Sequence, residues 1–213
     1  MTRVALLDYG VGNVGSVRRA LERLGAEVVQ TSEPAVVATS SRVVLPGVGA
    51  FAPARRSLAA SGLEEGIRAA LESGARLLGL CLGFQLLFDE SEEFGTTPGL
   101  GLLAGRIAPF PPGARVPHVG WNRLETEGAS AGPLLDRLPG GTYVYFVHSF
   151  RPEGVDPSDV AAWCDHGGRF VAAARRGNVW GCQFHPEKSS SAGRRILENF
   201  LSCLLYTSPS PRD

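Results

Sequence analysis

A cysteine between two glycines, at the junction of an expected strand and an expected helix, constrains the fold of this chain most. Residues 75–80 form a short apolar run typical of a buried strand, and residues 84–88 favour a helix. Between them lies Gly79-Leu80-Cys81-Leu82-Gly83. A Gly-x-nucleophile-x-Gly turn at such a junction is a nucleophile elbow, which lifts its central side chain clear of the sheet. The sequence therefore predicts that Cys81 ends a strand of an α/β fold.

The chemistry of an elbow explains each of these residue types. A Cβ atom at either glycine would collide with the tight turn. The dipole of the following helix favours a thiolate at Cys81, and its first backbone N–H groups can hold an oxyanion. Cys81 is therefore a candidate nucleophile. The alternative is a buried structural cysteine flanked by turn glycines.

A second motif supplies the partners that a cysteine nucleophile needs. Phe184-His185-Pro186-Glu187-Lys188 follows residues 179–183, an apolar run typical of a central strand. Residues two apart in an extended segment point to the same side, so we expect Glu187 to orient the imidazole of His185. Cysteine, histidine and carboxylate then follow the chain order of elbow-type hydrolases. The alternative for His185 is a strand-end residue that caps the turn at Pro186.

The composition excludes several classes of protein. The 213 residues suffice for one domain with a substantial core, and 21 basic residues balance 21 acidic ones. Balanced charge argues against a nucleic-acid partner and against binding at a membrane surface. We expect no signal peptide, since Met1-Thr2-Arg3 leads directly into a strand-like run, and no apolar segment approaches the ~20 residues of a membrane span.

The cysteine and histidine residues give no sign of a metal site. Four cysteines lie far apart without a C-x-x-C pair: Cys81, Cys164, Cys182 and Cys203. We therefore expect no disulfide framework, zinc site or cofactor, and we predict the reducing cytoplasm as the compartment. His118 and His148 lie in strand-like surroundings and are interpreted as structural histidines.

The first 90 residues predict alternating strands and helices. Strands are expected at residues 4–8, 27–30, 42–45 and 75–80. A helix with apolar residues at helical spacing is expected over residues 14–24, and Gly25 ends it. Strands separated by helices imply parallel βαβ units, whose ligands gather at the carboxyl ends of the strands. Residues 8–10, residues 46–49 and Cys81 follow such ends, so we expect them to meet at one edge of the sheet.

From about Pro98 the sequence favours antiparallel structure. The segments around residues 106–107, 142–147 and 170–173 are expected to be strands of this portion, and residues 191–204 a closing amphipathic helix. We predict an α/β domain over residues 1–205, with a mostly parallel central sheet, helices on both faces and an antiparallel C-terminal portion. Residues 206–213 have no packing pattern, and we expect an unstructured tail that is an expression or sequence-assembly scar.

A glycine pattern near the start of the sequence raises the alternative of a dinucleotide-binding site. Residues 10–15 fit G-x-G-x-x-G after a strand, as in dinucleotide-binding proteins. Such proteins place an acidic residue at the end of the second strand, where this chain has Gln30-Thr31, and Glu33 is a poor substitute. The sequence therefore argues against a nicotinamide or flavin site.

Six stretches in order resemble the class I, triad-type glutamine amidotransferases, and the resemblance covers residues 3–204. It is strongest to the glutaminase subunits of imidazole glycerol phosphate synthases, and it implies a flavodoxin-like fold. The stretches are residues 8–13, 46–51, 79–87, 117–122, 145–150 and 184–189. Three positions depart from the family pattern: Phe84 and Val119 stand where methionine is common, and Phe150 replaces a frequent tyrosine. The last change would remove a hydroxyl contact in the expected substrate pocket.

The resemblance implies a Cys-His-Glu triad. Cys81 would attack the carboxamide carbon of glutamine to give a thioester and ammonia, and water would then release glutamate. His185 would move the proton, and Glu187 would fix its tautomer. The oxyanion would bind the backbone N–H of Leu82 and one N–H of the glycine-rich strand Gly47-Val48-Gly49.

The resemblance also implies the groups that hold the rest of the substrate. Gln85 and Glu93 would hold the α-amino and carboxylate ends of glutamine, with Ser149 and Phe150 beside them. A carboxylate facing an ammonium makes physical sense for Glu93. The alternative is that Glu93 belongs to a solvated acidic loop over residues 90–93.

The resembled subunits dock on a (β/α)8-barrel cyclase, which receives the ammonia, and form a heterodimer with it. Trp121 and Tyr145, taken as aromatic residues of a loop, are expected to anchor this interface. Asn13 is expected at the same edge, and Lys188 would meet an acidic residue of the partner.

Four functions remain open at this point. The leading hypothesis is glutamine hydrolysis coupled to imidazole glycerol phosphate synthesis in histidine biosynthesis. A glutaminase of another synthase, such as pyridoxal phosphate synthase, does not explain residues 118–122 and 145–150. An unrelated cysteine hydrolase or peptidase gives no use to Gln85 and residues 46–49. A catalytically silent interaction module is hard to reconcile with an intact triad.

Overall fold

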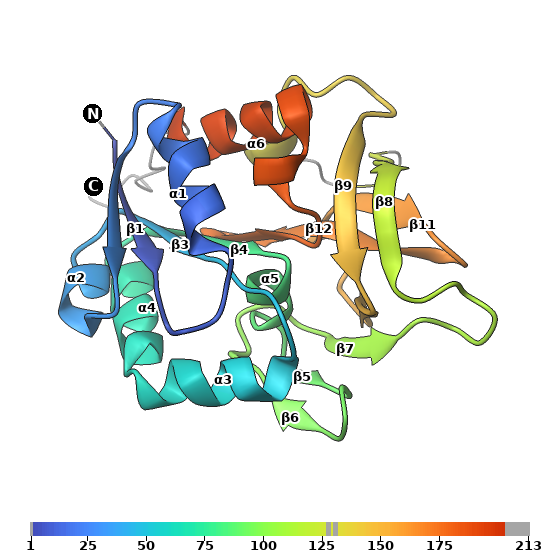
Figure 1. The fold of residues 1–213 in the computed structure, drawn as a ribbon, viewed down its shortest axis with the longest axis horizontal. Helices are drawn as coiled ribbons and strands as arrows, with labels where there is room; N and C mark the ends of the chain where they lie inside the picture. The colour runs from blue at the N-terminus through green and yellow to red at the C-terminus, as the bar shows by residue number, and fades with distance from the viewer. Residues whose placement is uncertain (1, 127–128, 130–131, 203–213) are drawn as a thin grey trace, which may run out of the picture.

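Within residues 2–126, 129 and 132–202, which the computed structural model describes, a seven-stranded sheet forms the centre of the molecule (Figure 1). Its strands lie in the order β11 (Val160–Asp165), β12 (Arg169–Arg176), β13 (Val179–Cys182), β4 (Arg76–Leu80), β3 (Arg42–Leu45), β1 (Arg3–Leu7) and β2 (Glu27–Thr31). From β13 to β2 neighbouring strands are parallel, whereas β12 and β11 are antiparallel. The predicted mostly parallel sheet with an antiparallel C-terminal portion is confirmed.

Helices cover both faces of this sheet. One face carries α1 (Val14–Glu22) and α6 (Ser190–Ser202), and the other carries α2 (Pro34–Ala38), α3 (Phe51–Ala60) and α4 (Leu63–Glu72) (Figure 1). Alternate residues of a buried strand point to opposite faces, so one strand supplies two cores. Leu6 packs in the cluster that contains α1 and α6, whereas Leu7 packs in the cluster that contains α3 and α4. Among the described residues, none of the helices combines the length and the apolar composition that a membrane-spanning segment needs.

Two smaller sheets complete the antiparallel portion. A four-stranded sheet has the order β10 (Phe150–Glu153), β7 (Arg106–Pro109), β5 (Glu90–Ser91) and β6 (Thr97–Pro98). A two-stranded antiparallel ribbon consists of β8 (His118–Arg123) and β9 (Tyr143–His148), and the short 3-10 helix η1 (Pro133–Leu135) lies in its connection. Ser149 lies between β9 and β10, so the chain passes there from the ribbon to the four-stranded sheet.

The boundaries of helices α1 and α6 differ from the predicted ones. Helix α1 ends at Glu22, because the N–H groups of Leu24 and Gly25 bond to carbonyls three residues back and close a tighter turn. Helix α6 begins at Ser190, one residue early, and is described to Ser202. The end of the predicted helix, Cys203 and the predicted tail lie outside the described residues.

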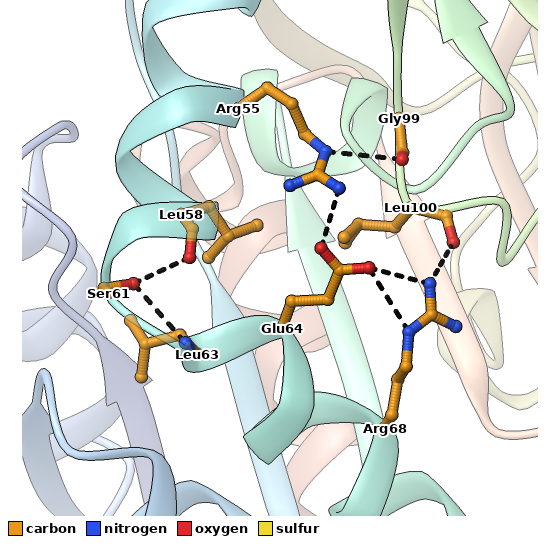
Figure 2. Close-up of polar contacts among 8 residues, drawn as sticks. All are labelled: Arg55, Leu58, Ser61, Leu63, Glu64, Arg68, Gly99 and Leu100. Carbon is orange, nitrogen blue, oxygen red and sulfur yellow. Dashed lines mark hydrogen bonds and ion pairs between the residues drawn. The ribbon is translucent and has the colours of Figure 1, made fainter.

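A partly buried ion cluster ties α3 and α4 to the segment after β6 (Figure 2). The carboxylate of Glu64 accepts hydrogen bonds from Arg55 at 2.7 Å and from Arg68 at 2.9 Å. Arg55 also donates to the carbonyl of Gly99 at 3.3 Å, and Arg68 to that of Leu100 at 2.9 Å. These bonds fix the strand pair β5–β6 against the two helices.

Candidate active site

Cys81 occupies the turn between β4 and the short helix α5 (Leu82–Gln85) in a backbone conformation that side chains rarely adopt. Its φ is 53° and its ψ is −109°. A Cβ atom on Gly79 would lie 2.8 Å from the carbonyl oxygen of Gly83, and one on Gly83 would overlap the carbonyl of Leu45. Both glycines are therefore required by close backbone approach, as predicted for the elbow.

The helix after the elbow is shorter than the sequence pattern indicates. Helix α5 ends at Gln85, and Leu87 and Phe88 continue in turns whose N–H groups bond three residues back. The run at residues 84–88 is apolar because its side chains are buried in the core beneath the elbow, and not because the whole run is helical.

The Sγ atom of Cys81 lies beside a cavity of about 230 Å³ at the carboxyl edge of the sheet. Gln183 directs Nε2 toward Sγ at 3.8 Å, and the carbonyl of Val147 lies 3.8 Å from the same atom. The cavity is lined by Val48, Gly49, Cys81, Leu82, Gln85, Glu93, Pro117, Val147, His148, Ser149, Phe150 and His185. The structure thus brings most of the predicted catalytic, oxyanion and substrate-binding residues to one cavity.

His185 and Glu187 form a nearly fully buried pair behind the cysteine. Nδ1 of His185 lies 2.8 Å from Oε1 of Glu187, and the two side chains are 4% and 2% exposed. The expected extended segment is wrong: Pro186–Lys188 is a 3-10 turn, η2. The pair still forms because His185 itself is extended, and proline favours the first position of the turn that brings Glu187 back to the ring.

The electrostatics of this pair favour a protonated imidazole. Burial lowers the pKa of His185, but its interactions with Cys81 and Glu187 outweigh burial and raise the pKa from 6.5 to about 9. The other ring nitrogen, Nε2, is buried and makes no hydrogen bond of normal geometry with a described residue. This nitrogen is therefore free to exchange a proton with a group at the thiol.

The glycine-rich segment next to the cavity is a loop, not the predicted strand. Strand β3 ends at Leu45, and residues 46–49 lead from it to α3. Tyr9 donates a hydrogen bond of 2.6 Å from its hydroxyl to the carbonyl of Pro46, which anchors the start of this loop. Val48 and Gly49 line the cavity, whereas Gly47 is buried and does not line it. Gly49 has a φ of +101°, a conformation that favours glycine.

The amide of Gln85 is held from two sides. Its Nε2 donates to the carbonyl of Phe150 at 3.1 Å and to Oε1 of Gln183 at 2.9 Å. Both amide hydrogens are thus engaged, so Oε1 of Gln85 is its remaining polar atom on the cavity wall. Gln183 is not among the residues predicted from the sequence. Its signal is a polar residue within a buried run, directly before the histidine motif.

The structure brings together three of the four predicted interface residues. The rings of Trp121 and Tyr145 lie 6.1 Å apart, and Nζ of Lys188 lies 5.8 Å from the Tyr145 ring. The two aromatic residues face one another across β8 and β9 and are not on a loop as expected. Asn13 precedes the first residue of α1, on a separate element.

The residues offer little to a metal or a dinucleotide. Within the described ranges no group of three or more His, Cys, Asp or Glu side chains is arranged to hold a metal ion. At the end of β2, Gln30 donates to Asp8 at 2.7 Å, in the place where a dinucleotide site has a carboxylate for the ribose.

Comparison with known proteins gives one consistent family. The model of the family "Glutamine amidotransferase class-I" matches residues 5–203. The chain is 45% identical over 213 residues to "Imidazole glycerol phosphate synthase subunit HisH" of Symbiobacterium thermophilum, which covers 99% of this chain and 100% of the relative. It is 48% identical over 202 residues to the subunit of the same name from Thermosynechococcus vestitus, with 93% and 96% covered.

Solved structures share the fold at lower identity. One described as "Crystal structure of glutamine amidotransferase" has a TM-score of 0.71 at 24% identity and covers 92% of this chain and 98% of its own. "Structure of PurLQS from Thermotoga maritima" has a TM-score of 0.73 at 22% identity, with 94% and 97% covered.

Proposed function

Because this chain belongs to the class I glutamine amidotransferases, among the imidazole glycerol phosphate synthase subunits HisH, we propose that the Cys81 cavity is its glutaminase site. The chain is the glutaminase subunit of such a synthase. The observation that carries the proposed site is the meeting of the Cys81 elbow with the buried His185–Glu187 pair at one cavity.

In the proposed reaction Cys81 is the nucleophile. Its sulfur bonds to the carboxamide carbon of glutamine, and the C=O electron pair moves onto oxygen. The C–N bond then breaks, and protonated His185 gives its Nε2 proton to the leaving nitrogen, which departs as ammonia. Water attacks the resulting thioester as His185 takes its proton, and glutamate and the cysteine are released. Glu187 holds Nδ1 of the ring throughout.

The oxyanion is proposed to bind two backbone N–H groups. One belongs to Leu82, the first residue of α5, whose N–H has no partner within the helix. The other comes from the loop that contains Val48 and Gly49 on the opposite wall. Each such donor is worth about 10²–10³-fold in turnover.

The α-ammonium and α-carboxylate groups of glutamine are assigned to other residues of the cavity wall. Oε1 of Gln85 accepts a hydrogen bond from the α-ammonium group, and the carboxylate of Glu93 adds a charge of opposite sign. Ser149 lies beside them as a donor for the α-carboxylate. Phe150 contributes its backbone carbonyl through Gln85, so the missing tyrosine hydroxyl does not affect this contact.

The outer face of the β8–β9 ribbon is the proposed docking surface for a cyclase with a (β/α)8-barrel fold, as a heterodimer. Val119, Trp121 and Val147 are exposed apolar residues of this ribbon, and Lys188 adds a positive charge beside it. Such a patch, rimmed by charge, is typical of an interface. The proposed compartment is the cytoplasm, where the cavity thiol stays reduced.

The experiment is co-purification with the cyclase followed by two parallel synthase assays, one with glutamine and one with ammonia. We expect Cys81→Ala to abolish the glutamine-dependent reaction and to keep the ammonia-dependent one. Cys164→Ala is the matched control, since Cys164 is buried in β11. An active Cys81→Ala variant would overturn the assignment, and failure to bind the cyclase would overturn the proposed partner.

A further inference from the structure

A chain of hydrogen bonds runs from the β8–β9 ribbon to the wall of the active-site cavity. Nδ2 of Asn122 lies 3.3 Å from Nε2 of His118, and Nδ1 of His118 lies 2.9 Å from Nε2 of His148. Nδ1 of His148 lies 2.8 Å from the carbonyl oxygen of Phe150. The same carbonyl accepts the bond from Gln85, so the chain ends on the group that holds the Gln85 amide.

The carbonyl acceptor at the end of this chain of hydrogen bonds fixes the direction of every bond in it. A carbonyl oxygen can only accept, so Nδ1 of His148 carries a hydrogen. In a neutral imidazole Nε2 of His148 is then an acceptor, which requires a hydrogen on Nδ1 of His118. Nε2 of His118 in turn accepts from Asn122, whose other amide hydrogen goes to the carbonyl of Asp165 at 2.8 Å. Both histidines are therefore Nδ1–H tautomers.

The surroundings keep the two rings neutral. Burial lowers the pKa of His118 to about 4, and burial likewise lowers the pKa of His148 to about 3. The titratable groups that face them are His166, whose ring stacks on His118 at 3.9 Å, and His185. Phe110, Phe146 and Phe170 pack around both rings. A neutral pair can keep one fixed hydrogen-bond direction.

We propose that His148 and His118 are positioning residues for glutamine: their directional hydrogen bonds hold the Phe150 carbonyl, which holds Gln85. This inference rests on the proposed substrate role of Gln85. The bond from His148 to Phe150 spans Ser149, where the chain leaves the ribbon for the four-stranded sheet. Without the bond from His148, the Phe150 carbonyl can turn away from Gln85. Gln85 then loses one of the two acceptors that aim its Oε1 at the substrate.

The kinetic test uses His118, which is not on the cavity wall. His118→Phe keeps the stacking on Phe146 and His166 but removes the donor to His148. In complex with the cyclase we expect its KM for glutamine to rise about tenfold, the usual effect of losing one hydrogen bond, with kcat within about twofold. His118→Asn places an amide nitrogen where Nδ1 was and is expected to restore KM. His166→Phe is the control, because His166 is not part of the chain of hydrogen bonds. We expect its KM for glutamine to be unchanged.

The structural test uses the unmodified full chain and does not depend on turnover. Long-range ¹H–¹⁵N correlations at pH 7 are expected to show both histidines as Nδ1–H tautomers, unprotonated down to about pH 5. An Nε2–H tautomer at either ring, or an unchanged KM in His118→Phe, would overturn the proposal. An active His118→Phe with unaltered KM contradicts only the positioning role, whereas an active Cys81→Ala contradicts the proposed function.

Discussion

The carboxylate of Glu93 accepts a hydrogen bond of 2.6 Å from the backbone N–H of Phe51, the first residue of α3. The residue before Phe51 is Ala50, which provides no capping side chain, so Glu93 caps the helix from a distant part of the sequence. A negative charge at a helix N-terminus is favourable. The same carboxylate borders the cavity, so Glu93 is not simply a solvated residue of an acidic loop. Its contact with glutamine is the proposed role.

Two substitutions separate these roles of Glu93. Glu93→Gln keeps an oxygen that accepts from Phe51 but removes the charge, so we expect nearly native stability and a KM for glutamine raised about tenfold. Glu93→Ala removes both, and we expect a further loss of about 1 kcal/mol in the free energy of unfolding. Thermal unfolding and glutaminase kinetics measure the two effects. Equal kinetics for Glu93→Gln and the unmodified chain would exclude recognition of the ammonium by this charge.

A glutamine-analogue electrophile is expected to label Cys81 and to leave Cys164 and Cys182 unmodified. Burial raises the pKa of Cys164 to about 12 and also raises the pKa of Cys182 well above its ordinary value, so neither forms a thiolate near neutral pH. Peptide mapping by mass spectrometry identifies the labelled residue. Labelling of Cys182 at a similar rate would mean that the nucleophile is wrongly assigned.

The pKa of His185 gives a prediction for pH dependence. It lies at about 9 in the folded chain and near 6.5 when unfolded, so the protonated ring stabilises the fold fully below pH 6.5, and this stabilisation is lost as the pH rises through 9. In Glu187→Gln one cause of the raised pKa is removed while burial remains, and the pKa is expected to fall. Histidine NMR titration measures both values, and an unchanged pKa would show that Glu187 does not act on the ring.

The same variant is expected to lose about 10²–10⁴-fold in glutaminase turnover, because the amide no longer holds His185 in the tautomer that its acid–base role requires. The loss should be smaller than in Cys81→Ala, because the amide keeps the shape of the carboxylate. A fully active Glu187→Gln would mean that the third member of the triad lies elsewhere.

The predictable parts of this structure depend on local pattern. The strands at the elbow and before His185 could be predicted, because buried parallel strands give short apolar runs. The elbow glycines could be predicted because their cause, close backbone approach, lies within the same turn. The meeting of the Cys81 and His185 motifs was expected from the chemistry of the two motifs, whereas the parallel pairing of β4 with β13 that brings them together is visible only in the structure.

The parts that could not be predicted depend on contacts between distant segments. The hydrogen bond from Phe51 to Glu93 joins residues that are 42 apart, and the bond from Gln85 to Gln183 joins residues that are 98 apart. Local patterns contain no information on such pairs. The pattern of residues 46–49 predicts a strand, but the segment is a loop, because a hydrogen bond from Tyr9 and not strand pairing holds it.

A prediction of stability follows from the ion cluster at Glu64. Its side chain is 19% exposed and that of Arg55 is 17% exposed, so Glu64→Ala leaves a partly buried guanidinium without this carboxylate. We expect a loss of about 2 kcal/mol in the free energy of unfolding, below the 3–5 kcal/mol of a fully buried pair. Glu22→Ala is the control, because its pair with Arg18 is exposed and worth about 0.3–0.5 kcal/mol. Equal losses in denaturant unfolding would show that burial of the cluster is energetically unimportant.

Trp121 is the expected anchor for the cyclase on the outer face of the β8–β9 ribbon. Trp121 is 52% exposed and packs against Tyr145 with its remaining surface, so its ring is already held in place and loses little freedom on binding. Rigid aromatic residues of this kind are typical binding hot spots.

We expect Trp121→Ala to weaken the complex by about 2 kcal/mol or more, roughly a thirtyfold rise in Kd, by isothermal titration with the cyclase. Lys188→Ala should give a smaller rise that shrinks with added salt, because exposed charges are screened. Phe94→Ala is the matched control, since Phe94 is 93% exposed but lies between β5 and β6, outside the ribbon. If Phe94→Ala weakens the complex and Trp121→Ala does not, the cyclase binds at a surface other than the ribbon.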